Sequence, residues 1–120
     1  MIKRIVAIDD DKDILEIMNI IFQDEGFESI LLSNGVDAEE IITKNPDLVL
    51  LDVNIVGYHK TGNQICEDIK GFTTANNFPV FLVSAEPDLA SIAAHCGADG
   101  YISKPFDIFK LTNMIKDFLS

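Results

Sequence analysis

The run Leu48-Val49-Leu50-Leu51 contains no polar residue and ends directly at Asp52. A strand with one exposed face alternates between apolar and polar residues, whereas a strand buried on both faces is apolar throughout. Strands of the second kind belong to parallel sheets that helices cover on both sides. The run therefore predicts a central strand of a parallel sheet, with a carboxylate at its carboxyl end.

Four further apolar runs of strand length lie on either side of this one, and helical patterns separate them. The other predicted strands are residues 5–8, 29–32, 80–83 and 100–102. The predicted helices lie between a cap at Asp10 or Asp11 and Gly26, and at about 36–44, 62–70, 89–96 and 108–119. This order predicts an α/β fold, a doubly wound five-stranded parallel sheet in the flavodoxin-like order 2-1-3-4-5 with five helices on its two faces.

The apolar residues of the helices predict which faces are buried. In the first helix, the spacing i, i+3, i+4, i+7 is met by Ile14, Ile17, Met18 and Ile21. In the last helix, the predicted buried face comprises Ile108, Leu111, Ile115, Phe118 and Leu119. Five phenylalanines are expected in the core or at its rim: Phe72, Phe78, Phe81, Phe106 and Phe109.

Composition narrows the function. The 120 residues suit one domain over 1–120, and 20 acidic against 9 basic residues give a net charge of −11. This charge argues against binding to nucleic acid or to an anionic membrane surface. No apolar run is long enough to span a membrane, and the first residues lack the features of a signal peptide. Cys66 and Cys96 have no metal-binding spacing, which predicts free buried thiols in the reducing cytoplasm.

Polar residues follow the predicted strands where each strand ends. Asp9 and Asp10 follow the first, Asp52 the third, Ser84 the fourth, and Lys104 closely follows the fifth. An aspartate after a strand often caps the next helix, a role that suits Asp11 but not Asp52, since the next helical pattern begins about ten residues later. Because the carboxyl ends of parallel strands share one edge of a sheet, these side chains are expected to meet.

Three clustered carboxylates repel one another unless a cation lies among them, and Mg²⁺ prefers such hard oxygen ligands. Asp52 is then a candidate nucleophile toward a phosphoryl group, with Asp9 and Asp10 as metal ligands. Lys104 is expected to pair with a phosphate oxygen, and the Ser84 hydroxyl to donate to another.

These residues also match a family over essentially the whole chain. The marks are Asp9-Asp10, the Leu-Leu-Asp that ends at Asp52, Ser84-Ala85, and Gly-Ala-Asp-Gly-Tyr-Ile-Ser-Lys-Pro-Phe at 97–106. With these marks in this order, the sequence resembles the receiver domain of two-component response regulators, a group that includes stand-alone chemotaxis-type regulators.

The resemblance implies a role for each matching position. Asp52 would accept phosphate from a phosphohistidine of a sensor histidine kinase or a histidine phosphotransfer protein. Mg²⁺ or Mn²⁺ would be bound by Asp9, Asp10, Asp52 and the backbone carbonyl of Asn54. Ser84, Ala85 and Lys104 would form the phosphate site, with Lys104-Pro105 as a cis peptide.

The same resemblance implies a conformational switch and residues that set the lifetime of the phosphorylated state. Ser84 and Tyr101 would move together on phosphorylation and change the surface of the fourth helix, fifth strand and fifth helix, which an unknown output protein reads. Asn54 and Glu86 occupy positions that influence hydrolysis of the acyl phosphate, and polar groups there predict a short-lived phosphoryl state.

The sequence departs from the family in the loop after Asp52. Val56 replaces a frequent proline, and the loop to Gly62 is longer by about two residues. His59 in this loop is expected to be solvated rather than a ligand, and His95 with Asp88 is a candidate partner contact on the fourth helix.

Three alternatives remain open. One is a receiver-like interaction module that takes no phosphate, although every acceptor residue is present. Another is a hydrolase with an aspartyl-phosphate intermediate, which needs an acid where this chain has Asn54. The third is a flavin-binding protein of the same sheet order, whose phosphate loop would replace the three aspartates at 9–11.

Overall fold

All five strands run parallel in one sheet, as shown by a computed structural model that describes residues 2–72 and 78–119. The strands are β1 Arg4–Ile8, β2 Glu28–Leu32, β3 Leu48–Asp52, β4 Val80–Ser84 and β5 Gly100–Ser103. Their order is β2-β1-β3-β4-β5, which confirms the predicted topology. β1 and β3 are neighbours at the point where the strand order reverses, so Asp9 and Asp52 leave the sheet side by side.

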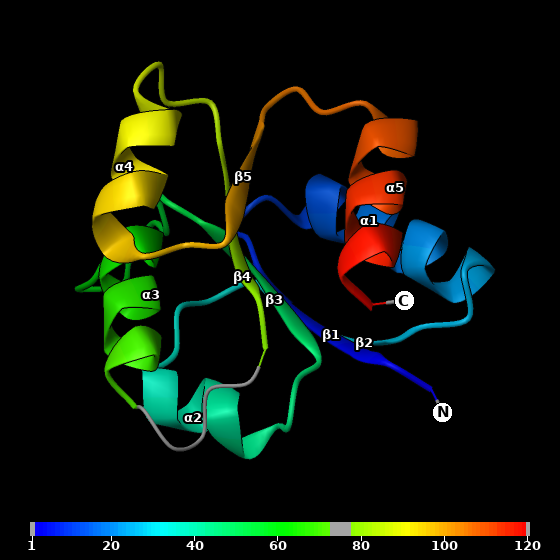
Figure 1. Ribbon diagram of the computed structural model, residues 1–120, viewed down its shortest axis with the longest axis horizontal. Helices are drawn as coiled ribbons and strands as arrows, with labels where there is room; N and C mark the ends of the chain where they lie inside the picture. The colour runs from blue at the N-terminus through cyan, green and yellow to red at the C-terminus, as the bar shows by residue number, and fades with distance from the viewer. Residues whose placement is uncertain (1, 73–77, 120) are drawn as a thin grey trace.

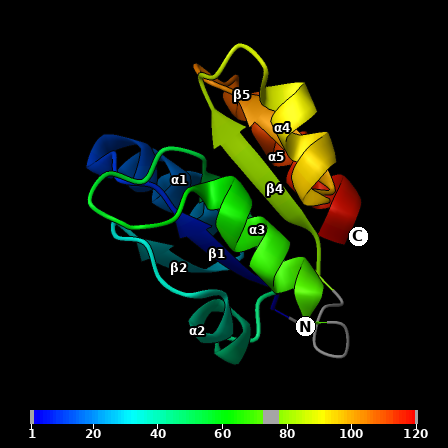
Figure 2. The same cartoon turned by 90° about the vertical axis from the view of Figure 1, so that its left-hand side faces the viewer.

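Helices cover both faces of the sheet (Figure 1). They are α1 Lys12–Asp24, α2 Ala38–Thr43, α3 Gly62–Gly71, α4 Leu89–Cys96 and α5 Ile108–Leu119. α1 and α5 lie on one face, and α2, α3 and α4 on the other (Figures 1 and 2). No helix within the described ranges has the length and apolar content to cross a membrane.

Each face of the sheet has its own hydrophobic core, and β3 contributes to both. Val49 and Leu51 pack toward α2, α3 and α4, whereas Leu48 and Leu50 pack toward α1 and α5. Successive side chains of a strand point to opposite faces, so a strand between two cores has no exposed position for a polar residue. This explains the continuous apolar run that ends at Asp52.

The predicted buried face of α1 was partly wrong. Met18 and Ile21 are buried as predicted, but their companions are Leu15 and Phe22, while Ile17 is 41% exposed. Most of this helix is apolar, so its stripe is wide enough to contain two overlapping helical patterns. Packing decides between them, because the face with Phe22 fills the space above the sheet.

The phenylalanine prediction also needs correction. Phe78 and Phe81 are buried and Phe106 packs against the core, but Phe72 is partly exposed and Phe109 is 79% exposed. In α5, Leu111 and Ile115 form the buried face, whereas Ile108 and Phe118 are about half exposed. Phe118 nevertheless makes an edge contact with Phe81, with 4.8 Å between the ring centroids.

The start of α3 lies unusually close to the end of β3. The Gly62 amide donates to the Val53 carbonyl at 2.9 Å, and a Cβ at Gly62 would lie only 1.9 Å from the backbone oxygen of Asp52. Only glycine fits this approach without a backbone shift. Gly62 therefore sets the path of the chain directly behind Asp52, a role that the sequence analysis missed.

We expect Gly62→Ala to lower the free energy of unfolding by about 3 kcal/mol, since the added methyl would collide with rigid backbone. Gly71→Ala is the matched control, because a Cβ there meets nothing within 4 Å. That variant should leave stability unchanged or raise it by about 0.5 kcal/mol, as alanine is the better helix former. Urea denaturation of the two variants measures both values, and equal stability would contradict the proposed contact.

Candidate functional site

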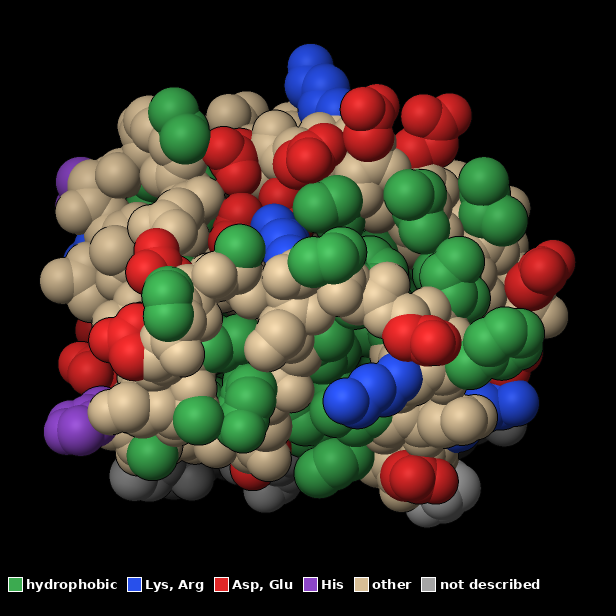
Figure 3. All heavy atoms as spheres, turned by 90° about the horizontal axis from the view of Figure 1, so that it is seen from above, with side chains coloured by type: hydrophobic (Ala, Val, Ile, Leu, Met, Phe, Trp, Pro, Cys, Tyr) green, Lys and Arg blue, Asp and Glu red, His purple; other side chains and the backbone are tan. Residues whose placement is uncertain are grey.

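The polar residues predicted at the ends of the strands meet at one edge of the sheet. Asp9 directly follows β1, Asp52 and Ser84 are the last residues of β3 and β4, and Lys104 directly follows β5. Figure 3 views the molecule from the side of this edge and shows acidic and basic side chains close together among hydrophobic ones. The parallel topology thus brings together residues that are up to 95 positions apart, counted from Asp9 to Lys104.

Three carboxylates form the centre of the site. Asp9 and Asp52 are buried, with 1% and 5% of their surface exposed, and Asp10 is half-buried. One oxygen from each of the three lies within 4.8 Å of the others. Lys104 spans the two buried carboxylates, with its Nζ 2.9 Å from Asp9 Oδ2 and 3.3 Å from Asp52 Oδ2.

Backbone amides fix the direction of the two buried carboxylates. The Asp11 amide donates to Asp9 Oδ1 at 2.9 Å, and the Asn54 amide donates to Asp52 Oδ1 at 3.3 Å. The other oxygen of each carboxylate is the one nearer to Lys104. Asp9 Oδ2 accepts no hydrogen bond although it is fully buried, so its contact with Lys104 is one of charge.

The cluster shifts the pKa values of its members. Burial, together with the negative charge of Asp9 and a hydrogen bond with Asp10, raises the pKa of Asp52 to about 7, against the opposing effect of Lys104. Burial alone would lower the pKa of Lys104, but its contacts with Asp9 and Asp52 outweigh this and raise it. The ammonium thus stays charged while the carboxylates remain incompletely compensated.

This donor set fits a hard divalent cation. Mg²⁺ and Mn²⁺ bind carboxylate and carbonyl oxygens, and all three clustered residues supply carboxylate oxygens. Asp9 Oδ2 is buried against the Lys104 ammonium, and a divalent cation would take the place of that charge beside it. A divalent charge would also relieve the repulsion that raises the pKa of Asp52.

Ser84 lies next to this cluster at the end of β4. It is 1% exposed; its Oγ accepts a hydrogen bond from the Glu86 amide at 3.1 Å, and its carbonyl accepts one from the Lys104 amide at 2.9 Å. The peptide bond between Lys104 and Pro105 is cis. Ala85, the residue between Ser84 and Glu86, is exposed.

Asn54 and Glu86 form a bridge between the loops that follow β3 and β4. The side-chain nitrogen Nδ2 of Asn54 donates to Glu86 Oε1 at 2.7 Å. The sequence indicates that both residues lie near the site, but no pattern in it predicts that they pair. The bridge joins the two loops that directly follow Asp52 and Ser84.

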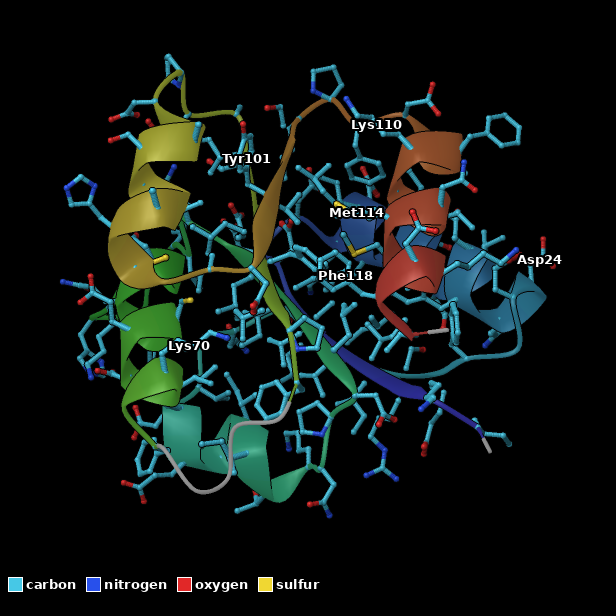
Figure 4. The ribbon with its side chains drawn as sticks, viewed as in Figure 1. Asp24, Lys70, Tyr101, Lys110, Met114 and Phe118 are labelled. Atoms are coloured by element: carbon cyan, nitrogen blue, oxygen red, sulfur yellow. The ribbon has the colours of Figure 1, made fainter. Side chains whose placement is uncertain are left out.

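Tyr101 is not brought into the carboxylate cluster. It pairs with Leu82 in the sheet, and 46% of its surface is exposed at the edge strand β5. It lines a groove of about 260 Å³ with Lys110 and Met114 of α5 (Figure 4). Ser84 and Tyr101 thus face different surroundings in this state, one buried beside the site and one at the surface.

Side chains anchor the loop between β3 and α3. The Tyr58 hydroxyl donates to Asp37 Oδ1, and the Tyr58 ring lies so close to Gly35 that a Cβ there would collide with it. Lys60 forms an ion pair with Asp68 at 2.5 Å. His59 is exposed beside the Tyr58 ring, which agrees with the prediction of a solvated loop histidine.

Comparisons with known proteins find similarity over most of the chain. The family model described as the response regulator receiver domain matches residues 5–116. Sporulation initiation phosphotransferase F of Bacillus subtilis is 34% identical over 122 residues, covering 99% of this chain and 95% of the relative. The DNA-binding response regulator MtrA of Mycobacterium tuberculosis is 31% identical over 109 residues, covering 88% of this chain and 46% of the relative.

A solved structure of a receiver domain has the same fold. The chain superposes on a CheY-like response regulator receiver domain protein from Methanospirillum hungatei with a TM-score of 0.81 and 26% identity. The match covers 99% of this chain and 94% of the solved one.

The raised pKa of Asp52 predicts a pH-dependent stability in the presence of a chelator. The folded protein binds the proton of the Asp52 carboxyl more tightly than the unfolded chain does. The contribution of this proton to the free energy of unfolding is therefore fully present below about pH 4 and is lost as the pH rises through about 7. Asp52→Asn cannot ionise, so it should be the more stable protein, by a margin that widens by about 2 kcal/mol between pH 5 and pH 8.

Urea denaturation at several pH values measures this margin, with Asp24→Asn as the control. Asp24 is exposed at the end of α1 (Figure 4), so its variant should follow the wild type at every pH. Saturating Mg²⁺ should narrow the margin at pH 8. A margin that does not change with pH would contradict the proposed electrostatics.

Proposed function

The chain belongs to the response regulator receiver family, and from this premise we propose that Asp52 accepts a phosphoryl group from a phosphohistidine of a partner protein. The observation that carries the proposal is the buried carboxylate of Asp52 beside Asp9, Asp10 and Lys104. An acceptor needs a carboxylate oxygen, a charge partner for the incoming phosphoryl oxygens and a place for a divalent cation. This edge of the sheet offers all three.

In the proposed reaction, an oxygen of Asp52 attacks the phosphorus atom of the donor. The P–N bond to the donor histidine breaks as the P–O bond to Asp52 forms, and the histidine nitrogen takes up a proton. Mg²⁺ would supply positive charge that offsets the negative charge of the phosphoryl oxygens. Asp9, Asp10, Asp52 and the backbone carbonyl of Asn54 are the residues that would bind it.

Lys104 and Ser84 complete the proposed site. Lys104 now contacts two carboxylates, and an ammonium on a flexible stem can turn to a phosphoryl oxygen when one carboxylate becomes an acyl phosphate. Ser84 offers a hydroxyl at the same edge, and Ala85 leaves room beside it. Both residues gain a phosphoryl partner only when Asp52 is modified, so they can report its state.

We also propose that Ser84 and Tyr101 form the switch. Movement of the Ser84 hydroxyl toward the phosphoryl group would open space beneath β5, and Tyr101 at the exposed edge could turn into it. The groove that Tyr101 lines with Lys110 and Met114 would then change shape. An output protein that recognises the face of α4, β5 and α5 would read this change.

The surroundings of the site favour a protein as the phosphodonor, either a sensor histidine kinase or a histidine phosphotransfer protein. An apolar groove of about 420 Å³ adjoins Lys104, lined by Ile14 and Ile17 of α1 and by Pro105 and Phe106. A small phosphorylated metabolite would not need such a surface. The relative named a phosphotransferase supports a role in phosphoryl transfer. We propose that the reaction takes place in the cytoplasm, where histidine kinases have their phosphodonor domains.

The first prediction from this function concerns phosphorylation itself. With acetyl phosphate and Mg²⁺, the wild-type chain should gain one phosphoryl group that hydroxylamine removes, as expected of an acyl phosphate. Asp52→Asn should gain none, whereas Asp24→Asn should be labelled like the wild type. Intact-protein mass spectrometry measures the added phosphoryl group. Undiminished labelling of Asp52→Asn would show that Asp52 is not the phosphoacceptor.

The second prediction concerns the lifetime of the acyl phosphate. If the bridge between Asn54 and Glu86 orients the attacking water, Asn54→Ala and Glu86→Ala should each lengthen the half-life about threefold or more. Because the two side chains act as a pair, the double variant should exceed neither single variant by much. Independent effects that multiply in the double variant, or a wild-type label that persists for hours with Mg²⁺, would rule out this role.

A further inference from the structure

The two cysteines of the chain meet in the core between α3 and α4. Cys66 and Cys96 are 30 positions apart in sequence, yet the Cys66 thiol donates to the Cys96 carbonyl at 3.6 Å. The Cys96 thiol donates to the Ala93 carbonyl of its own helix at 3.5 Å. Both side chains are free and buried, and neither has a part in the proposed phosphoryl transfer.

This contact is close enough to matter for covalent chemistry. A disulfide requires two cysteines whose backbones approach closely, with Cα atoms about 4.4 to 6.8 Å apart. A Cys66 sulfur within 3.6 Å of the backbone oxygen of Cys96 places the backbone of one residue within reach of the side chain of the other. The chain therefore brings its whole complement of cysteines into one contact.

Neighbouring interactions fix the position of the two helices beside the thiols. Lys70 of α3 forms an ion pair with Asp99 at 2.7 Å, and Asp99 also accepts a hydrogen bond from the Val80 amide at 2.8 Å. The Lys70 stem lies close to Gly97, which ends α4 with a positive φ of 78°. Figures 2 and 4 show α3, which carries Lys70, beside α4. The end of α4 is thus held against α3 while both thiols are reduced.

We propose that Cys66 and Cys96 form a reversible disulfide that links α3 to α4 when the chain meets a small-molecule disulfide such as oxidised glutathione. One cysteine, as its thiolate, attacks the glutathione disulfide and releases one glutathione, which leaves a mixed disulfide. The second cysteine then displaces the second glutathione, so that two thiols and one disulfide become one disulfide and two thiols.

Burial has a clear effect on the rate of this exchange. Burial, the nearby Cys96 thiol and Asp99 together raise the pKa of the Cys66 thiol, so the reactive thiolate is scarce in the closed fold. The first attack therefore waits for a local opening of α4, a helix of eight residues. The second step is intramolecular, because closure of α4 returns Cys96 to its position beside Cys66.

The disulfide would restrain α4 where it meets α3. α4 follows the loop after Ser84 and precedes β5, which carries Tyr101, so the bond would limit motion on one side of the α4, β5 and α5 face. The inference does not rest on phosphoryl transfer at Asp52. It can therefore be tested without Mg²⁺ or a phosphodonor.

The test is an equilibrium titration of the full chain in glutathione buffers of increasing oxidised fraction. Free thiols are then trapped with iodoacetamide after unfolding, and the digested peptides are identified by mass spectrometry without reduction. We expect a Cys66–Cys96 linked peptide from a monomeric protein. The midpoint is the ratio [GSH]²/[GSSG] at which half of the chain carries this disulfide. It should be at least tenfold higher for the native chain than for the same chain held in guanidinium chloride.

Because the midpoints are measured at equilibrium, they do not depend on how fast the buried thiols react. Amide hydrogen exchange should slow about tenfold in α4 on oxidation of the wild type and should not change in Cys66→Ala. If that variant fails to fold, the two midpoints of the wild-type chain still decide. Native and unfolded midpoints that coincide, or disulfides that form only between molecules, would overturn the proposal.

Discussion

The carboxyl edge of the sheet carries more negative charge than its own cation can balance, and the rest of the site depends on this imbalance. Lys104 contacts Asp9 and Asp52, while Asp10 adds a third carboxylate to the cluster. Burial prevents water from screening the charges, so desolvation and the repulsion from Asp9 raise the pKa of Asp52. The fold tolerates the arrangement because two hydrophobic cores stabilise the sheet beneath it.

Topology explains why this cluster could be predicted from the sequence. Parallel strands all end at the same edge, so Asp52 after a continuous apolar run already indicates where the site lies. The order of strands then makes Asp9 and Asp52 neighbours, since β1 pairs with β3. These inferences need only the positions of the strands, which buried apolar runs mark clearly.

Other features could not be predicted because they depend on packing rather than on position along the chain. The helical period of α1 fits two faces, and only contact with the sheet selects the one that contains Phe22. The bridge from Asn54 to Glu86 joins two loops whose conformations no pattern specifies. Gly62 looks like any glycine at a helix start, and its need for space is visible only against the Asp52 backbone.

The loop after β3 shows how a departure from the family pattern can be structurally compensated. The resemblance to receiver domains leads us to expect a proline at position 56, where this chain has Val56, which is 76% exposed and cannot fix φ as a proline would. The restraint comes instead from side chains further along: Tyr58 packs over Gly35, Lys60 pairs with Asp68, and Thr61 begins α3 with a capping box. These contacts all join the loop to the α2 and α3 side of the molecule. The near end of the loop is held separately, by the hydrogen bond from Asn54 to Glu86, so the two ends of the loop are anchored to different parts of the molecule.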